Sequence, residues 1–140
     1  MATTTAAVTL TSDLLSDNMS VIADTICMKA GTTADGLDQM DMGYVEVATG
    51  TNFDLLDANN SGLNNSKANK VYICNESTDE TYYVIITIDS QAIGRLYAGD
   101  WMFIPADFHD AAGDIAITAN GGTNKICYAL FHEGTALVTT

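Results

Sequence analysis

Residues 82–88 alternate between two kinds of side chain, and this alternation constrains the fold more than any other feature of the sequence. The even positions are all apolar, whereas the odd positions become polar toward Asp89. Successive side chains of a β-strand point to opposite faces, so the pattern predicts a strand with one buried face and one half-covered face. Residues 71–74 alternate in the same way and predict a second strand.

Other short runs rich in β-branched and aromatic residues, which strands favour, surround these two. They predict strands at Ala6–Thr11, Ser20–Met28, Tyr44–Ala48, Ile93–Tyr97, Trp101–Ile104, Ile115–Thr118 and Lys125–Phe131. No long helical period occurs, and only residues 11–17 could form a helical turn. Short strands separated by turns predict an all-β chain, an antiparallel β-sandwich or jelly-roll-like single domain. Its predicted core is Val71, Ile73, Val84, Ile86, Ile88, Ile115, Ile117, Ile126, Tyr128 and Leu130.

Turn signals lie between the predicted strands. Ala98-Gly99-Asp100 and the segment 119–123, which contains Asn-Gly-Gly, each predict a hairpin turn between the strands on either side. Two polar stretches, residues 31–43 and 59–69, predict surface loops.

The first eleven residues are rich in Thr and Ala and carry no charged side chain. We therefore expect an N-terminal segment over residues 1–11, followed by the sandwich domain over residues 12–140. The segment is either a frayed end or an extended arm. An extended arm can add a strand to the sheet edge of a neighbouring subunit.

The charge balance excludes several classes of partner. Five Lys and Arg residues face 18 Asp and Glu residues, which gives a formal net charge of −13. Such a chain has no basic surface for nucleic acid and is repelled by anionic membranes. The N-terminus lacks the cationic and apolar regions of a signal peptide, so we expect synthesis and folding in a cytoplasm. The three cysteines, an odd number in separate apolar runs, predict buried free thiols.

Two segments could carry metal or acid–base chemistry. Residues 57–62 match the first half of a calcium-binding EF-hand loop, but position twelve is Ala68, where a Glu is needed. Asp107, His109 and Asp110 could join the pair 132–133, His-Glu, as metal ligands or as an acid–base pair, or they could be solvated loop charges.

Motifs that would identify an enzyme are absent from the sequence. It contains no Gly-x-Ser-x-Gly, no glycine-rich phosphate loop and no pair of closely spaced Cys or His ligands. We therefore expect a non-enzymatic protein with no cofactor and no specific metal site.

The segment Ile93–Pro105 is the most distinctive part of the sequence. It contains Arg95, the only arginine of the chain, which either forms a structural ion pair within a hairpin or binds a carboxylate of another subunit. Trp101 and Phe103 fall on the same face of a strand, where they either fill the core or anchor an interface.

Four runs together resemble small virion structural proteins of tailed bacteriophages. They are Asn69-Lys-Val-Tyr-Ile-Cys-Asn75, Tyr82-Tyr-Val-Ile-Ile86, Ile93-Gly-Arg-Leu-Tyr-Ala-Gly-Asp-Trp-Met-Phe-Ile-Pro105 and Tyr128-Ala-Leu-Phe-His-Glu133. The resemblance covers residues 69–133. It implies a β-sandwich or jelly roll that works as a homotrimer or larger ring on the virion, most like a capsid decoration (cement) protein bound to the major capsid protein.

Two alternatives to a decoration protein stay open. One is a tail or fibre component. The other is a carbohydrate- or receptor-binding module of the virion, in which exposed Trp101, Tyr97 or Tyr82 stacks on sugar rings. In each case, contacts with other chains are expected at the arm and at the 93–105 segment. The candidate interface residues are Thr3, Thr4, Thr5, Val8, Arg95, Tyr97, Trp101 and Phe103.

Overall fold

The structure is a computed structural model that describes residues 3–12, 19–50, 52–57, 68–106 and 114–133. Its strands are β1 (Thr5–Ser12), β2 (Met19–Ile26), β3 (Gln39–Ala48), β4 (Asn52–Leu56), β5 (Asn69–Asn75), β6 (Tyr83–Ile88), β7 (Gln91–Tyr97), β8 (Trp101–Pro105), β9 (Ile115–Ala119) and β10 (Thr123–His132). The described residues include no helix, and so none that is long and apolar enough to cross a bilayer.

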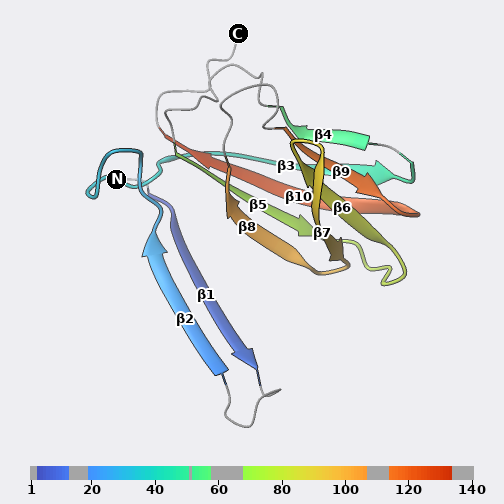
Figure 1. The fold of residues 1–140 in the computed structure, drawn as a ribbon, viewed down its shortest axis with the longest axis horizontal. Coiled ribbons are helices and arrows are strands. Elements are labelled where there is room, and N and C mark those ends of the chain that lie inside the picture. Colours follow the sequence, from blue (N-terminus) through green and yellow to red (C-terminus); the bar gives the residue numbers. More distant parts are fainter. Residues whose placement is uncertain (1–2, 13–18, 51, 58–67, 107–113, 134–140) are drawn as a thin grey trace.

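Strands β3 to β10 form two four-stranded antiparallel sheets that pack face to face as a β-sandwich (Figure 1). The first sheet has the order β3-β10-β5-β8, and the second has the order β4-β9-β6-β7. Eight strands divided equally between two packed sheets make a jelly-roll-like arrangement. The all-β sandwich predicted from the alternation of side chains is therefore confirmed.

Connections between consecutive strands of the sandwich mostly cross from one sheet to the other. Among these strands, only β6 and β7 are both consecutive and paired, through a turn whose Asp89 and Ser90 have φ of 51° and 61°. Positive φ at both central residues is what a two-residue hairpin turn requires. The predicted hairpins at 98–100 and 119–123 are wrong, because β7 and β9 belong to the second sheet while β8 and β10 belong to the first. Glycine allows a sharp reversal in either case, so it does not distinguish a hairpin from a crossover.

Two other predicted boundaries differ from the structure. Strand β3 begins at Gln39, so the predicted loop over residues 31–43 is shorter than expected. Strand β4, with the sequence Asn-Phe-Asp-Leu-Leu, was not predicted because it contains no β-branched residue. It pairs with β9 through an irregular register near Leu56 and completes the second sheet.

The hydrophobic core lies between the two sheets and contains all ten predicted residues. Eight of them belong to the buried cluster, and Ile88 and Tyr128 are partly buried and pack against it. Strand β6 shows the expected division, because Val84 and Ile86 are fully buried while Tyr83 and Ile85 are half-buried on the opposite face.

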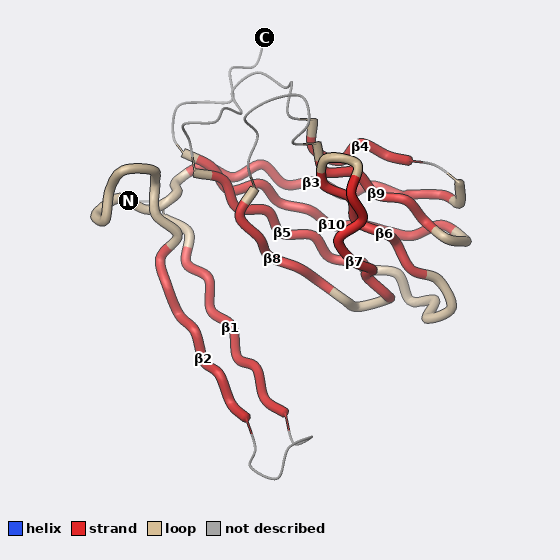
Figure 2. Tube along the Cα trace, in the orientation of Figure 1, coloured by secondary structure: helices blue, strands red, loops and turns tan. Residues whose placement is uncertain are grey.

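Strands β1 and β2 form a separate two-stranded antiparallel sheet, the arm hairpin, whose register runs from Thr5↔Ile26 to Ser12↔Met19. It projects away from the sandwich (Figures 1 and 2). The projecting unit is therefore a hairpin over residues 5–26 rather than a single segment over residues 1–11. Thr11 and Ser12 are in strand β1, and the rest of the predicted helical turn lies outside the described residues.

Candidate binding surface

The outer face of the first sheet is built from alternate residues of its four strands. The register aligns them in three rows: Tyr44, Cys127, Cys74 and Trp101; Met42, Ala129, Tyr72 and Phe103; Met40, Phe131, Lys70 and Pro105. Ten of these twelve residues, all except Lys70 and Pro105, are named here the apolar face. Strand alternation produces it, because the residues between them point into the core.

Four large side chains of the apolar face are more than half exposed. The exposed fractions are 55% for Met40, 52% for Met42, 58% for Tyr44 and 52% for Trp101. Single exposed apolar residues are normal, but a contiguous apolar patch of several hundred square ångströms marks an interaction site. The apolar face is therefore the candidate binding surface of this protein.

Aromatic contacts hold part of this surface in place. The rings of Tyr72 and Trp101 lie 6.4 Å apart between centroids, and those of Phe103 and Phe131 lie 6.3 Å apart. Tilted aromatic pairs at this separation attract one another beyond their burial. Because the pairs join β5 to β8 and β8 to β10, the surface is preorganised for a partner.

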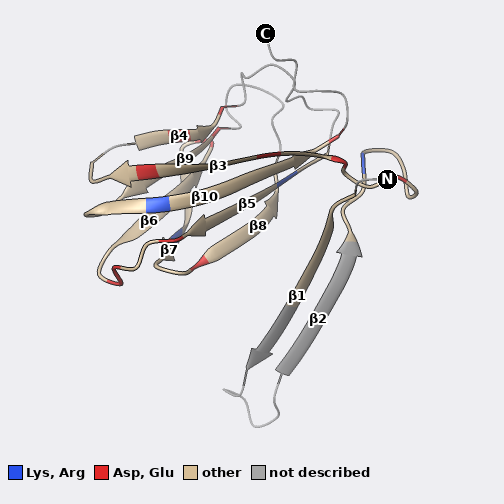
Figure 3. Ribbon diagram, turned by 180° about the vertical axis from the view of Figure 1, so that it is seen from behind, with Lys and Arg blue, Asp and Glu red and all other residues tan. Residues whose placement is uncertain are grey.

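The apolar face is also neutral. A hydrogen bond with the Cys74 thiol, together with burial, raises the pKa of Tyr72 to about 12. Burial likewise raises the pKa of the Cys127 thiol. Figure 3 shows that Asp and Glu of the described chain lie mainly at turns and strand ends, while β5, β8 and β10 carry few charges. A mainly apolar surface, with Lys70 at its border, thus stands out on a protein of net charge −13.

A groove of about 350 Å³ runs between the start of the arm hairpin and the apolar face. One wall is formed by residues 4–8, and the other is formed by Tyr72, Trp101, Phe103 and Phe131. The beginning of the hairpin and the apolar face are therefore parts of one continuous surface.

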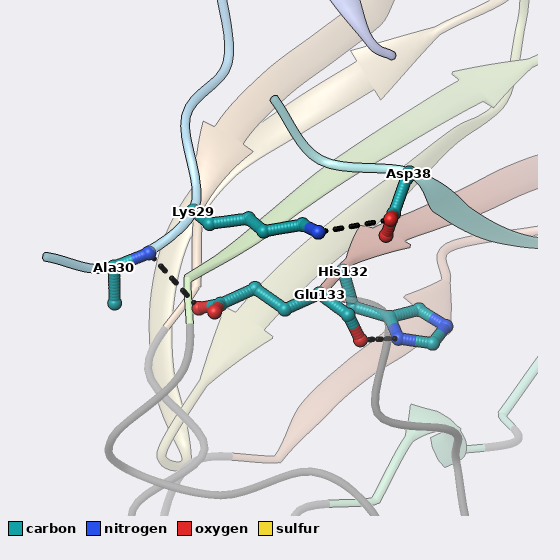
Figure 4. Close-up of polar contacts among 5 residues, drawn as sticks. All are labelled: Lys29, Ala30, Asp38, His132 and Glu133. Atoms are coloured by element: carbon teal, nitrogen blue, oxygen red, sulfur yellow. Dashed lines mark hydrogen bonds and ion pairs between the residues drawn. The ribbon is translucent and has the colours of Figure 1, made fainter. Parts of the chain in front are cut away.

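Polar contacts fix the base of the arm hairpin to the sandwich (Figure 4). Glu133 is 7% exposed, and its Oε2 accepts hydrogen bonds from the backbone N–H of Ala30, at 3.1 Å, and of Ala68. Lys29 Nζ donates to Asp38 Oδ2 at 2.9 Å, which closes the segment between β2 and β3.

Backbone hydrogen bonds also hold the base of the arm hairpin against the sandwich. The N–H of Cys27 donates to the Thr4 carbonyl at 2.9 Å, and the N–H of Leu37 donates to the Cys27 carbonyl at 2.7 Å. Leu37 is fully buried. The direction in which the hairpin leaves the sandwich is therefore set by buried and hydrogen-bonded groups rather than by a free linker.

The predicted interface residues divide between two surfaces. Thr4, Thr5, Val8, Trp101 and Phe103 line the groove together. Thr3 is exposed and lies beside them in an adjoining depression that also contains Met40 and Phe131.

Arg95 and Tyr97, in contrast, lie on β7 of the second sheet. The guanidinium carbon of Arg95 is 4.4 Å from the ring centroid of Tyr83, which in turn lies 5.1 Å from the ring of Tyr97. Arg95 thus interacts with two tyrosines of its own sheet, through the ring of Tyr83 and through a side-chain hydrogen bond with Tyr97 that raises the pKa of Arg95. The structure does not bring the two β7 residues together with Trp101 and Phe103 on one surface.

Sequence reasoning missed several residues of the apolar face, including Met40, Met42, Tyr44 and Tyr72. The signal was present, because Met-x-Met-x-Tyr at residues 40–44 alternates with period two. The first part of this run lies in the polar stretch 31–43, whose composition predicts a surface loop.

The candidate metal and acid–base residues are only partly described. His132 and Glu133 are buried, and His132 Nε2 lies 3.0 Å from Asp41 Oδ2. Residues 107–110 and most of the calcium-like loop lie outside the described residues. Within the described part of the chain, no three His, Cys, Asp or Glu residues are grouped as metal ligands. The three cysteines are free, but Cys74 is only half-buried because it faces outward on the sheet.

Comparison with protein-family models, with curated proteins and with solved structures gave no match for this chain.

Proposed function

We propose that this protein is a non-enzymatic structural protein of a virion, most like a capsid decoration protein that binds the major capsid protein of a tailed bacteriophage. The observation that carries this proposal is the apolar face, an uncharged and preorganised sheet surface on a strongly acidic chain. Such a surface fits adhesion to another protein.

Electrostatics supports a passive adhesive role. At net charge −13, copies in solution repel one another and other acidic proteins at long range. Attachment then depends on short-range burial of apolar surface, for which four half-exposed Met, Tyr and Trp side chains are suited. The resemblance of residues 69–133 to phage virion proteins indicates that the expected place of this adhesion is a virion.

A carbohydrate-binding role is the second candidate, and exposure of Trp101 favours it. The ring is half exposed and borders a groove, as sugar stacking requires. The polar side-chain groups of that groove are two threonine hydroxyls, the Tyr72 hydroxyl and the Trp101 indole N–H. Sugar sites pair an aromatic platform with convergent hydrogen-bonding groups, so this groove is better suited to a protein surface.

The test uses virions purified from cells in which the chain is produced. We expect the protein at a copy number close to that of the coat protein, and image reconstruction should locate it on the capsid lattice. Location in the tail would select the tail or fibre alternative, and absence from particles would contradict the proposal.

A rebinding assay links this location to the surface. Particles stripped of the protein are mixed with the wild-type chain, with Met42→Gln/Trp101→Gln, or with the control Ile93→Gln. Ile93 is 51% exposed on the second sheet, so it matches the exposure of the two face residues. We expect lower occupancy for the face variant alone. Equal occupancy for all three would remove the apolar face from the contact.

A further inference from the structure

We propose that the arm hairpin of one copy of this chain covers the apolar face of a second copy. The proposal goes beyond virion location, because it concerns contact between copies. It joins the projecting hairpin to the exposed outer face of the first sheet.

The arm hairpin belongs to neither sheet of the sandwich. Its two strands pair only with each other among the described strands, and Val8 near its base is 38% exposed. A two-stranded hairpin standing alone is marginally stable in water. It therefore gains stability by lying against another apolar surface.

The dimensions of the hairpin and the face correspond. Each hairpin strand has eight residues and is about 26 Å long, while the seven residues of β5 and the ten of β10 span about 23 and 33 Å. The hairpin can therefore lie along most of the first sheet. The strands of the hairpin and those of the sheet thus have similar lengths.

The exposed area is also of the right size. Each of the four half-exposed side chains of the face offers on the order of 100 Å², because large side chains of this kind bury 150–250 Å² in total. With the partly exposed Tyr72, Cys74, Phe103 and Phe131 the patch reaches roughly 600 Å², about three quarters of the roughly 800 Å² per partner of a stable interface.

Charge favours the same pairing. Strand β1 has no charged residue and β2 has only Asp24, so the hairpin is the segment of this acidic chain that another copy repels least. Lys70, on the outer side of the first sheet, is opposite in sign to Asp24, whereas Lys125 on the same side is aligned with Glu46 and forms an ion pair with Glu76 at 3.9 Å.

The hydrogen bonds at the base of the hairpin favour contact with the apolar face of a second copy over contact with the face of the same copy. Hydrogen bonds to Glu133 and between Cys27 and Thr4 hold the base, and from there the hairpin points away from the sandwich (Figure 1). In the same chain, the base of the hairpin, residues 3–8 and 26–28, borders the apolar face, whereas the rest of both strands projects away from the sandwich (Figure 1). The arm of one copy and the face of the next make a head-to-tail contact, and repetition of such a contact gives a ring where the rotation between copies closes and a filament where it does not.

The first experiment measures the mass of the full-length protein in solution by light scattering at micromolar concentration. We expect the wild type to be an oligomer, and we expect Val21→Glu in the arm and Met42→Glu in the face each to be monomeric. Val21 lies on β2 in register with Leu10 of β1, beyond the residues 4–8 that line the groove. Ile93→Glu, on the second sheet at an exposure nearly equal to that of Met42, should keep the wild-type mass. Circular dichroism verifies folding, and Leu10→Glu in the arm or Met40→Glu in the face replaces a variant that fails this check.

The second experiment mixes the two monomeric variants. The arm variant retains an intact face and the face variant retains an intact arm, so the mixture should form a dimer of one copy of each and stop there. Burial of Trp101, the only tryptophan, should shift its emission to shorter wavelength in the mixture but in neither variant alone.

Three results would overturn the proposal. A monomeric wild type would mean that the face binds a different protein, which leaves the proposed virion function intact. An arm variant that keeps the wild-type mass would indicate face-to-face association. A mixture that stays monomeric would show that arm and face do not meet. Conversely, a confirmed ring that is absent from virions would contradict the proposed function alone.

Discussion

The two sheets of the sandwich bury equivalent inner faces but present opposite outer faces. On the first sheet the outward residues include Met40, Met42, Tyr44 and Trp101, all more than half exposed. On the second sheet the outward positions of β4 and β9 carry polar groups, and the Thr118 hydroxyl donates to the Asn52 side-chain oxygen at 3.2 Å. The first surface is apolar across all four strands, whereas the second is mixed, with polar groups on β4 and β9 and exposed Ile93 and Tyr97 on β7.

This difference distinguishes the residues that folding requires, on the inner faces, from those that are available for binding, on the outer faces. A sandwich requires apolar residues on both inner faces, because those faces supply the core. The outer faces contribute little to folding, so their composition is free to serve solubility or binding. An apolar outer face on only one sheet therefore indicates a binding role for that sheet.

The largest predicted effect tests whether the two inner faces are equivalent. Ile73 on the first sheet and Ile86 on the second are 0% and 1% exposed. Ile73→Ala and Ile86→Ala should each lower the free energy of unfolding by about 2–5 kcal/mol, measured by denaturant titration. Ile85→Ala, on the half-buried outer side of β6, should cost clearly less. An unchanged midpoint for either core variant would mean that its sheet does not share the core.

A smaller effect concerns the link between the sheets. Asn75 of β5 is fully buried, and its Nδ2 donates to the Leu96 carbonyl of β7 at 3.0 Å. Asn75→Ala leaves that buried carbonyl without this donor and should cost about 1–3 kcal/mol. Asn52→Ala, at an exposed amide of the second sheet, should change stability by less than about 0.5 kcal/mol. Equal costs would show that the crossing hydrogen bond is unimportant.

The outer faces should differ in dye binding rather than in stability. At concentrations where the protein is monomeric, a dye that fluoresces on apolar surfaces should bind the wild type through the first sheet. Met42→Gln/Trp101→Gln should lower the signal by roughly half, because it removes two of the four most exposed large side chains of the patch. Ile93→Gln should leave the signal nearly unchanged, and an equal loss would place the patch elsewhere.

The smallest effect is a pH dependence confined to the first sheet. The Tyr72 pKa is raised from 10.0 to about 12 in the folded protein, so the folded state retains this proton where the unfolded state loses it. The stability contribution is complete below pH 10 and is lost as pH rises toward about 12. Denaturant midpoints across this range should fall less steeply for Tyr72→Phe than for the wild type. Parallel curves would contradict the shift.

Strand positions and core membership were largely predictable from the sequence. Ile73, Val84, Ile86 and Ile117 each sit in an alternating run, and burial follows directly from that local pattern. Strand β4 was missed because its five residues have low strand propensity and depend on β9 for their place in the sheet. The binding surface was predicted only in part, through Trp101, Phe103 and the start of the arm.

By itself, the sequence determined that this chain is all-β and which side chains form its core, because alternation is a property of neighbouring residues. Only the tertiary structure decided which strands pair, and hence that the glycine turns at 98–100 and 119–123 cross between sheets. It also decided that Met42, Tyr72 and Phe103 share one outer row. These residues come from strands far apart in the chain, and a surface shared by them exists only once register and sheet order align their backbones.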